Sequence, residues 1–221
     1  MTESRDQVVL VNERDEVIGS EDKFAAHQIP AKLHRAISVW MVDTQGRLLL
    51  QQRSSQKIVG AGWWGNTVCG NVWPGESYEA CALRRLQVEL GISSVQLDPL
   101  VKFHYQASAN DQYSEHEMDQ VFGSRVDSSQ VMPQPNPEEV TEVLWVSARQ
   151  FVESVDAALA EFAQQQGRPF PTVAETVQMT AEELRLFTPP LTVRLERNEL
   201  LMVPWTLLMV QLPEVRAYLG A

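Results

Sequence analysis

The chain has 221 residues, of which 44% are hydrophobic and 21% are charged, as expected for a globular protein with one core. Its formal net charge is −11 and it has no run of lysine or arginine, which argues against binding to nucleic acid or to an acidic membrane surface. The same charge would repel an anionic substrate. Local cations or bound metal ions would therefore have to reverse the field at such a site.

The two cysteines and the first residues bear on the cellular compartment. Only Cys69 and Cys81 occur, so a disulfide scaffold is not expected and a reducing compartment fits the composition. The first ten residues, MTESRDQVVL, have neither a basic region nor an apolar stretch of signal length. No segment approaches the roughly 18 uninterrupted apolar residues of a membrane span. We therefore expect a cytoplasmic protein without a membrane partner.

The secondary structure is read from the periodicity of apolar residues and from turn and capping residues. Residues 23–27 lie between two strand-like runs and are predicted to be a connection. Strands are predicted at residues 7–12, 16–19, 34–43, 48–52, 66–69, 95–107, 115–126 and 142–147. Helices are predicted at residues 78–90, 148–165, about 180–184 and 204–219.

Strands alternating with a few helices predict an α+β fold of α/β/α sandwich-like layers, in which a mixed sheet is flanked by helices. The chain has no internal repeat or long low-complexity run, so residues 1–221 are predicted to form a single domain. The character of the sequence changes at residue 166, where a proline-containing stretch begins. Residues 166–197 are predicted to be an insertion or lid-like elaboration.

A loop containing glycine and proline leads from the strand at residues 66–69 into the helix at residues 78–90. Ser77 is suited to cap this helix, and Gly91 stands where a C-terminal glycine is common. Arg85 and Glu89 are four residues apart and therefore share one helical face. The opposite face, which would pack on a sheet, carries Leu83, Leu86 and Leu90.

This segment resembles the Nudix box, a glycine loop and helix that hold divalent metal ions against a diphosphate. The matching residues are Gly70, Glu76, Arg84, Glu89 and Gly91. The resemblance implies that Glu89 holds one Mg²⁺. A hydrolytic Nudix helix would have glutamates in place of Arg85 and Val88, and cleaving a diphosphate usually needs a carboxylate cluster that gathers metal ions. The segment therefore favours a site that grips a diphosphate without hydrolysing it.

Three further side chains could take part in chemistry, although each has an ordinary alternative. Cys69 ends a predicted strand beside the loop, so its sulfur should face the site, but an isolated cysteine is more often a small buried hydrophobe. Tyr105 shares a strand face with Phe103, as a core tyrosine would. Trp205 follows Pro204 at a helix start, where a tryptophan most often serves packing.

Histidines and glutamates supply candidate metal ligands. His27 and His34 are seven residues apart and do not share a helical face, and each alone is more typical of a structural or surface histidine. Glu115 and Glu117 flank His116 in a predicted strand, so the two carboxylates share one face and His116 points the other way. The alternative for this pair is a solvated acidic edge.

Eight short strings, taken together, resemble the type I isopentenyl-diphosphate isomerases of the Nudix superfamily. They occur in the family's order, cover roughly residues 7–150 and resume around Trp205. The strings are DKFAAH (22–27), KLHRA (32–36), NTVCG (66–70), PGES (74–77), RRLQVELG (84–91), FHYQA (103–107), EHE (115–117) and PW (204–205). A generic Nudix protein would not share the cysteine, the glutamate pair and both upstream histidines.

The resemblance implies an enzyme that converts isopentenyl diphosphate to dimethylallyl diphosphate by moving a double bond through a tertiary carbocation. Such chemistry needs an acid and a base on opposite sides of a dry pocket. By resemblance, Cys69 works on one side, and Glu117 with Tyr105 works on the other. Trp205 presents its π face to the cation, an interaction worth roughly 2 kcal/mol when desolvated.

The resemblance also implies two metal ions and a cationic site for a small-molecule diphosphate. A Mg²⁺ on Glu89 bridges the diphosphate. A second divalent ion, which could be Mg²⁺, Mn²⁺ or Zn²⁺, binds a mixed set of nitrogen and oxygen ligands. These ligands are His27, His34, Glu115 and Glu117. The anion-binding positions of the family correspond to Lys23, Arg53, Lys57 and Arg85.

The chain departs from the family at Asn71, where the family has a third metal-binding histidine. An asparagine carbonyl oxygen ligates Mg²⁺ but is a poor ligand for Zn²⁺. Three alternatives therefore stay open: an isomerase, a Nudix-type diphosphate hydrolase, and a catalytically weakened relative that binds diphosphates. The oligomeric state is also open, with a monomer as the working expectation.

Overall fold

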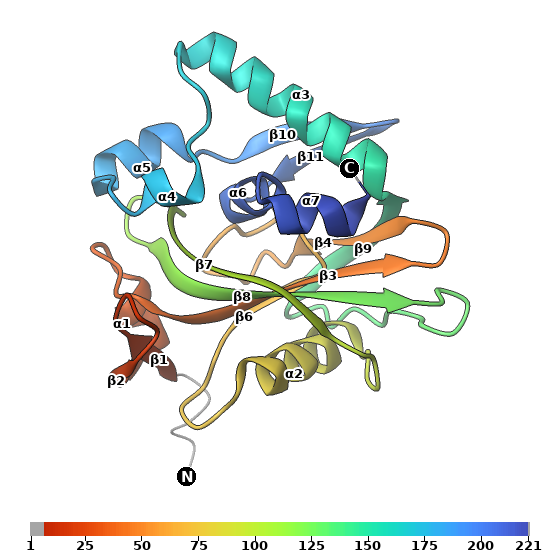
Figure 1. The fold of residues 1–221 in the computed structure, drawn as a ribbon, viewed down its shortest axis with the longest axis horizontal. Coiled ribbons are helices and arrows are strands. Elements are labelled where there is room, and N and C mark those ends of the chain that lie inside the picture. Colours follow the sequence, from red (N-terminus) through yellow and green to blue (C-terminus); the bar gives the residue numbers. More distant parts are fainter. Residues whose placement is uncertain (1–6, 221) are drawn as a thin grey trace.

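The computed structural model describes residues 7–220, which fold around one twisted sheet (Figure 1). Within this range eleven strands form a single mixed sheet with the main path β10-β11-β5-β4-β3-β1-β2, to which β6, β7, β8 and β9 attach. The strands are β1 (Gln7–Val11), β2 (Val17–Asp22), β3 (His34–Asp43), β4 (Arg47–Arg53), β5 (Trp64–Gly65), β6 (Val68–Asn71), β7 (Asp98–Ser108), β8 (Ser114–Val126), β9 (Val140–Ser147), β10 (Leu191–Leu195) and β11 (Asn198–Met202).

Helices cover both faces of the sheet, with α2 on one side and α3, α6 and α7 on the other (Figure 1). Each layer encloses its own cluster of buried apolar side chains, one against α2 and the other against α3 and α6. This layering confirms the predicted fold class. The helices are α1 (Lys23–His27), α2 (Tyr78–Leu90), α3 (Ala148–Gln166), α4 (Val173–Thr176), α5 (Ala181–Phe187), α6 (Pro204–Val210) and α7 (Pro213–Leu219).

Strand β3 is the element on which the site is built. It pairs in parallel with β8, with His34 opposite Glu117, and antiparallel with β6, with Ser38 opposite Cys69. Because successive strand residues alternate between faces, His34 and Ser38 point to the same face. Trp40 continues that face and packs in the cluster under α3 and α6. The predicted strand at residues 34–43 is confirmed at both ends.

Helix α2 begins and ends where its capping residues predicted. The Ser77 side chain accepts a hydrogen bond from the Ala80 amide at 3.1 Å, and Gly91 takes a left-handed conformation with φ of 65°. Leu86 and Leu90 are fully buried against the sheet. The opposite face therefore stays free to carry Arg85 toward the adjacent cavity.

The C-terminal region adds a hairpin and two short helices to this frame. Strands β10 and β11 form the hairpin, which joins the sheet where Met202 pairs in parallel with Trp64. Helices α4 and α5 lie beside the end of β7. There the Thr176 and Thr188 hydroxyls accept hydrogen bonds from the amides of Gln106 and Ser108 at 3.1 and 3.0 Å. The outer edge of β7 is thereby closed.

Several local predictions differ from the structure, and the helix predicted at residues 204–219 is divided into α6 and α7. Residues 23–27 form helix α1 instead of a plain connection, because the Asp22 side chain caps it by accepting from the Ala25 amide. The strand predicted at residues 66–69 lies at Val68–Asn71, since Asn66 uses its side chain to bind the Val39 and Val68 carbonyls. The hairpin of β10 and β11 was not predicted.

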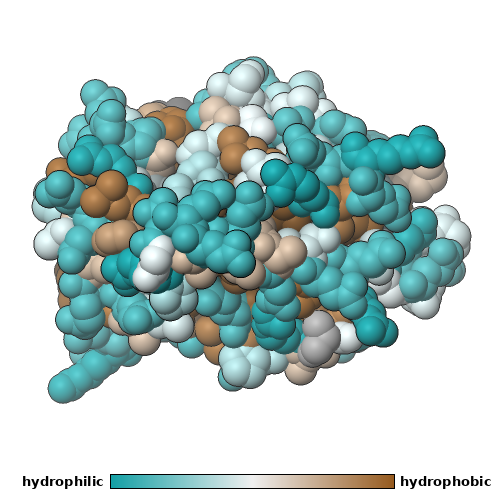
Figure 2. Space-filling view, turned by 90° about the horizontal axis from the view of Figure 1, so that it is seen from above, coloured by the Kyte–Doolittle hydropathy of each residue, from teal (hydrophilic) through white to brown (hydrophobic). Residues whose placement is uncertain are grey.

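The surface in Figure 2 is mostly hydrophilic, with hydrophobic side chains gathered in small separate areas. Among the helices described, none combines the length and apolar character needed to cross a membrane.

Candidate active site

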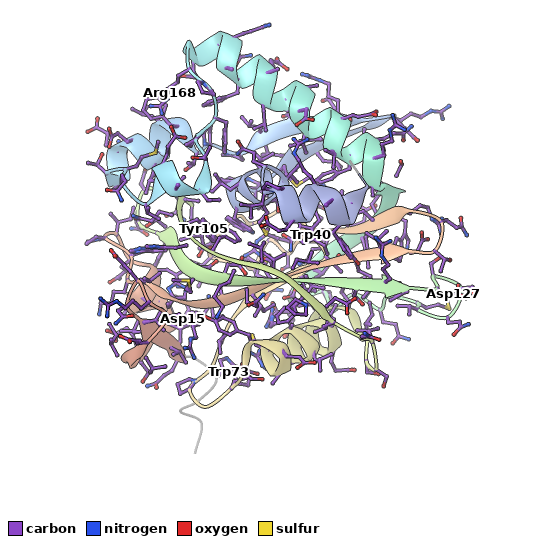
Figure 3. The ribbon with its side chains drawn as sticks, in the orientation of Figure 1. Asp15, Trp40, Trp73, Tyr105, Asp127 and Arg168 are labelled. Carbon is purple, nitrogen blue, oxygen red and sulfur yellow. The ribbon has the colours of Figure 1, made fainter. Side chains whose placement is uncertain are left out.

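A cavity of about 570 Å³ opens at one end of the sheet. Most of the side chains singled out from the sequence line it. They are Lys23, His27, Arg53, Lys57, Cys69, Asn71, Arg85, Tyr105, Glu115, Glu117 and Trp205. His34 and Glu89 lie just behind this lining, and both are buried. In Figure 3 Tyr105 lies on the side of the sheet facing α4 and α5, while Trp73 lies near α2.

Four side chains at one end of the cavity form a possible metal site. The ligand atoms of His27, His34, Glu115 and Glu117 all lie within 4.8 Å of one another. The two Nδ1 atoms contact the carbonyl oxygens of residues 23 and 32 at 2.7 and 2.8 Å, which directs both Nε2 atoms into the cluster. His27 Nε2 is 3.1 Å from Glu115 Oε2.

The donor set fits a divalent cation. Two imidazole nitrogens and two carboxylates are the mixed ligands that Mg²⁺, Mn²⁺ and Zn²⁺ accept to different degrees. Glu115 Oε2 is buried and has no contact in residues 7–220 other than His27 Nε2, which is itself a candidate ligand, so both atoms are available to a metal ion. Burial lowers the pKa of His34 to about 3, so this imidazole is neutral, as a ligand must be.

Asn71, which stands where the family resemblance implies a histidine, lies beside these ligands. Its Nδ2 lies 3.1 Å from His34 Nε2 and donates to Glu117 Oε1 at 3.2 Å. The amide thus links the two ligands that come from neighbouring strands β3 and β8. The Asn71 nitrogen, and not its carbonyl oxygen, faces the cluster.

Glu117 joins this cluster to the middle of the cavity. The Tyr105 hydroxyl donates to Glu117 Oε2 at 2.5 Å. Burial, together with the charge of Glu115, raises the pKa of Glu117 to about 8. Burial also opposes ionisation of Glu115, but the nearby His27 outweighs it and holds the pKa of Glu115 at about 2. The two carboxylates therefore differ in proton affinity despite their similar positions.

Cys69 faces the cavity from β6 and is held by two polar side chains. Its Sγ donates to Asn66 Oδ1 at 3.2 Å and lies 3.4 Å from Ser38 Oγ, which in turn donates to Asp119 Oδ2 at 2.7 Å. Burial, followed by the charge of Asp119, raises the pKa of the Cys69 thiol to about 12. The sulfur is therefore a protonated thiol near neutral pH.

Trp205 forms another wall of the cavity. Its side chain is 3% exposed, and the Arg53 guanidinium lies over one face of the indole at 5.3 Å from the ring centroid. The next residue, Thr206, donates to Asn66 Oδ1 at 3.0 Å and accepts from the Asn66 amide at 3.2 Å. Asn66 therefore contacts both Cys69 and the helix turn that carries Trp205.

Four cations gather at the other end of the cavity. Lys23, Arg53, Lys57 and Arg85 all line it. Burial first, and then the charges of the other three, lower the pKa of Lys23 to about 8. This crowding of positive charge in a chain with a net charge of −11 marks a site for an anion. A side chain at Gly70 would clash, because its Cβ would lie 2.6 Å from Arg85 Cγ.

Two carboxylates balance part of this charge. Arg85 donates through Nε to Glu89 Oε1 at 2.8 Å, as the shared helical face predicted. The second oxygen, Glu89 Oε2, is buried and receives no hydrogen bond from residues 7–220, which leaves it open to a Mg²⁺. Glu139 contacts both Lys57 and Arg85.

Sequence reasoning missed Ser38, Asn66, Asp119 and Glu139. One signal was present for Asp119, which continues the alternation of Glu115 and Glu117 along β8 and so faces the same side. Ser38 is an ordinary strand residue by pattern. Glu139 stands in a polar loop whose position relative to α2 depends on the tertiary fold.

Comparison with known proteins places this chain in a family. The model of the NUDIX domain matches residues 32–171, so the chain belongs to the Nudix family. A Deinococcus radiodurans protein of known crystal structure, DR0079, superposes with a TM-score of 0.55 at 24% identity, covering 72% of this chain and 98% of its own. This likeness concerns the fold.

Within the Nudix family, the chain belongs to the isopentenyl-diphosphate Delta-isomerases, which confirms the resemblance. It is 42% identical to the enzyme of that name from Streptomyces griseus, over 65% of this chain and 72% of that protein. It is 43% identical to isopentenyl-diphosphate Delta-isomerase 1 from Aromatoleum aromaticum, over 64% and 77%. The enzyme from Serratia proteamaculans is 40% identical, over 67% and 80%.

Proposed function

We propose that the protein isomerises isopentenyl diphosphate to dimethylallyl diphosphate in isoprenoid biosynthesis. One observation carries the proposal. The thiol of Cys69, which is protonated near neutral pH, and the carboxylate of Glu117 line the same cavity from strands that pair with opposite edges of β3. An allylic shift of a double bond needs one proton donor and one proton acceptor placed in this way.

The reaction adds one proton and removes another. A proton is added to the terminal carbon of the double bond, which leaves a tertiary carbocation, and a proton is lost from the methylene carbon adjacent to that cation. Cys69 exchanges the proton on one side, and Glu117 with Tyr105 exchanges it on the other. The buried indole of Trp205 stabilises the intermediate charge by its π face.

A metal ion held by the four candidate ligands would change the proton affinity of Glu117. His27, His34, Glu115 and Glu117 would hold one divalent ion, and Asn71 would orient Glu117 within that set. When bound, the ion supplies a positive charge that lowers the proton affinity of the Glu117 carboxylate. Asn71 in place of a histidine favours a hard ion, Mg²⁺ or Mn²⁺, over Zn²⁺.

The opposite end of the cavity would bind the diphosphate. Lys23, Arg53, Lys57 and Arg85 supply positive charge, and Glu89 would hold a Mg²⁺ that supplies further positive charge for the diphosphate. Arg85 and Val88 stand where a hydrolytic helix carries glutamates, so the anion is gripped without cleavage. Cys69 and Cys81 are free thiols, consistent with a cytoplasmic enzyme.

The segment of residues 166–197 supports the site from behind. We propose that it is an insertion into a single domain and that it holds β7 in place. The Thr176 and Thr188 hydroxyls accept hydrogen bonds from the β7 amides of Gln106 and Ser108. These two residues flank Ala107, and Gln106 directly follows Tyr105. No residue of this segment is among those that line the cavity in the described range, so support, and not closure, is its proposed role.

The test is a product assay with isopentenyl diphosphate and Mg²⁺, followed by ³¹P and ¹H NMR. The isomerase is expected to give dimethylallyl diphosphate with the diphosphate intact. Release of inorganic phosphate or pyrophosphate would favour the hydrolase instead. Conversion that rises only after Asn71→His would identify a weakened relative.

A further inference from the structure

Glu139 places a carboxylate inside the cationic end of the cavity. A single oxygen, Oε2, contacts Lys57 Nζ and lies 2.9 Å from Arg85 Nη2. Glu139 lines the cavity between these two cations, and a quarter of its side chain is exposed. The chain itself thus places an anionic oxygen where a phosphate oxygen would bind.

The loop that carries Glu139 is fixed on both sides. The Glu139 carbonyl accepts from the Ser54 amide at 3.0 Å, at the end of β4, and the Glu139 amide donates to Asn136 at 2.9 Å. Asn136 in turn donates to the Glu89 carbonyl at 2.9 Å, at the end of α2. Backbone contacts to the turn after β4, which carries Lys57, and to α2, which carries Arg85, therefore hold the Glu139 carboxylate in this position.

The four cations differ in what they already contact. Lys57 and Arg85 are paired with Glu139, and Arg53 donates to the Val59 carbonyl at 3.0 and 2.9 Å. Lys23 makes no side-chain hydrogen bond or ion pair with any residue from 7 to 220. An incoming anion therefore meets one open cation and must compete with Glu139 for two others.

We propose that Glu139 is a specificity-determining residue that makes diphosphate binding depend on a divalent cation. An anion that displaces Glu139 leaves this carboxylate beside the phosphate oxygens, which repel it. A divalent cation removes the repulsion, because Glu139 and the unpartnered Glu89 Oε2 can both turn to the metal. The site thereby selects metal-complexed diphosphates over free phosphate anions.

This inference rests on the anion site of the proposed function and not on the isomerisation step. Inorganic pyrophosphate is therefore the probe, titrated calorimetrically into the full chain with EDTA and again with excess Mg²⁺. If pyrophosphate binding behaves as described but no isomer forms, the proposed reaction fails and this inference stands.

The variant Glu139→Gln keeps the shape of the side chain and removes its charge. Metal-free pyrophosphate is expected to bind this variant about tenfold more tightly than wild type, and the gain on adding Mg²⁺ is expected to shrink by a similar factor. Glu138→Gln is the matched control, since Glu138 is the exposed neighbour and should behave as wild type. Glu139→Asp keeps the charge and should keep most of the metal dependence.

The opposite results would overturn the inference. Metal-free binding of pyrophosphate that is unchanged or weaker in Glu139→Gln, with the full gain in affinity on adding Mg²⁺ retained, would mean that Glu139 only positions Lys57 and Arg85. Circular dichroism melts check that each variant is folded. If Glu139→Gln is not, Glu139→Ala in the same titration serves as the second neutral variant, with the same expected direction.

Discussion

Cys69 and Glu117 lie on strands β6 and β8, which pair with opposite edges of β3, and their side chains line one cavity. The thiol has its pKa raised by burial to about 12, and burial with the charge of Glu115 raises that of the carboxylate to about 8. Both groups therefore hold a proton near neutral pH. A divalent ion held by Glu117 and its neighbours would lower the proton affinity of this carboxylate, so that it can act as the base while Cys69 stays a thiol.

Cys69→Ala is expected to abolish isomerisation while lowering the free energy of unfolding by only about 1 kcal/mol. The lost contacts are the thiol hydrogen bond to Asn66, whose Oδ1 keeps its bond from Thr206, and the 3.4 Å contact with Ser38 Oγ, which keeps its bond to Asp119. Turnover and thermal melts measure the two effects. Cys81→Ala is the matched control and should retain turnover, because Cys81 lies on α2, is buried between that helix and the sheet, and does not line the cavity. Turnover that survives in Cys69→Ala would make Cys69 a core residue.

Thr206→Val is expected to lower kcat and to leave KM nearly unchanged. The substitution removes both hydrogen bonds between Thr206 and Asn66, which fix Asn66 between Cys69 and the turn carrying Trp205. Leaving this buried amide partly unpaired costs roughly 1–3 kcal/mol of stability. Thr206→Ser keeps the hydroxyl and should restore kcat. An equal loss in both variants would point to packing of the methyl group instead.

The pH dependence of diphosphate binding is expected to follow Lys23. Its pKa falls from the usual 10.5 to about 8, mainly by burial, so Lys23 loses its charge as the pH rises through 8 when no anion is bound to it. An anion binds the charged form, so wild-type affinity should fall relative to Lys23→Gln by up to about tenfold between pH 7 and 9. Calorimetry with pyrophosphate at each pH measures the ratio. A ratio that stays constant would show that Lys23 remains charged throughout.

Asn71→His is expected to raise the affinity for Zn²⁺ by about tenfold or more. The change replaces an amide nitrogen that faces His34 and Glu117 with an imidazole that can ligate the ion. Competition with a coloured chelator measures the affinity without reference to activity. If Zn²⁺ affinity does not change, the side chain at this position does not reach the metal. A parallel large gain in turnover would favour the weakened relative.

Local patterns predicted much of the fold because the signals lie within a few residues. Ser77 and Gly91 fix both ends of α2, and the apolar run of β3 is correct from His34 to Asp43. The hairpin of β10 and β11 escaped prediction because the two central residues of its turn, Glu196 and Arg197, are neither glycine nor asparagine. Glu196 takes a left-handed φ of 50° there, and tertiary packing of the two strands holds it.

The site residues also differ in whether a local sequence pattern could predict their positions. The alternation along β8 was enough to place Glu115 and Glu117 together and to aim His116 elsewhere, where it meets His104 at 2.9 Å between the Nε2 atoms. Cys69 lies in the same cavity as this pair because β6 and β8 both pair with β3. No local sequence pattern predicts which strand pairs with which. Only the family resemblance could supply this pairing. The position of Glu139 could not be predicted either, because it depends on how its loop packs against β4 and α2.

Exchange of solvent deuterium tests the central claim most directly. Isopentenyl diphosphate is incubated with the protein and Mg²⁺ in D₂O, and the label is located by NMR. Deuterium is expected in the new methyl group of dimethylallyl diphosphate and in recovered substrate, and Cys69→Ala and Glu117→Gln should each lose it. Product that forms without solvent deuterium, or a folded wild-type protein that exchanges none, would contradict an alkene held between a thiol and a carboxylate.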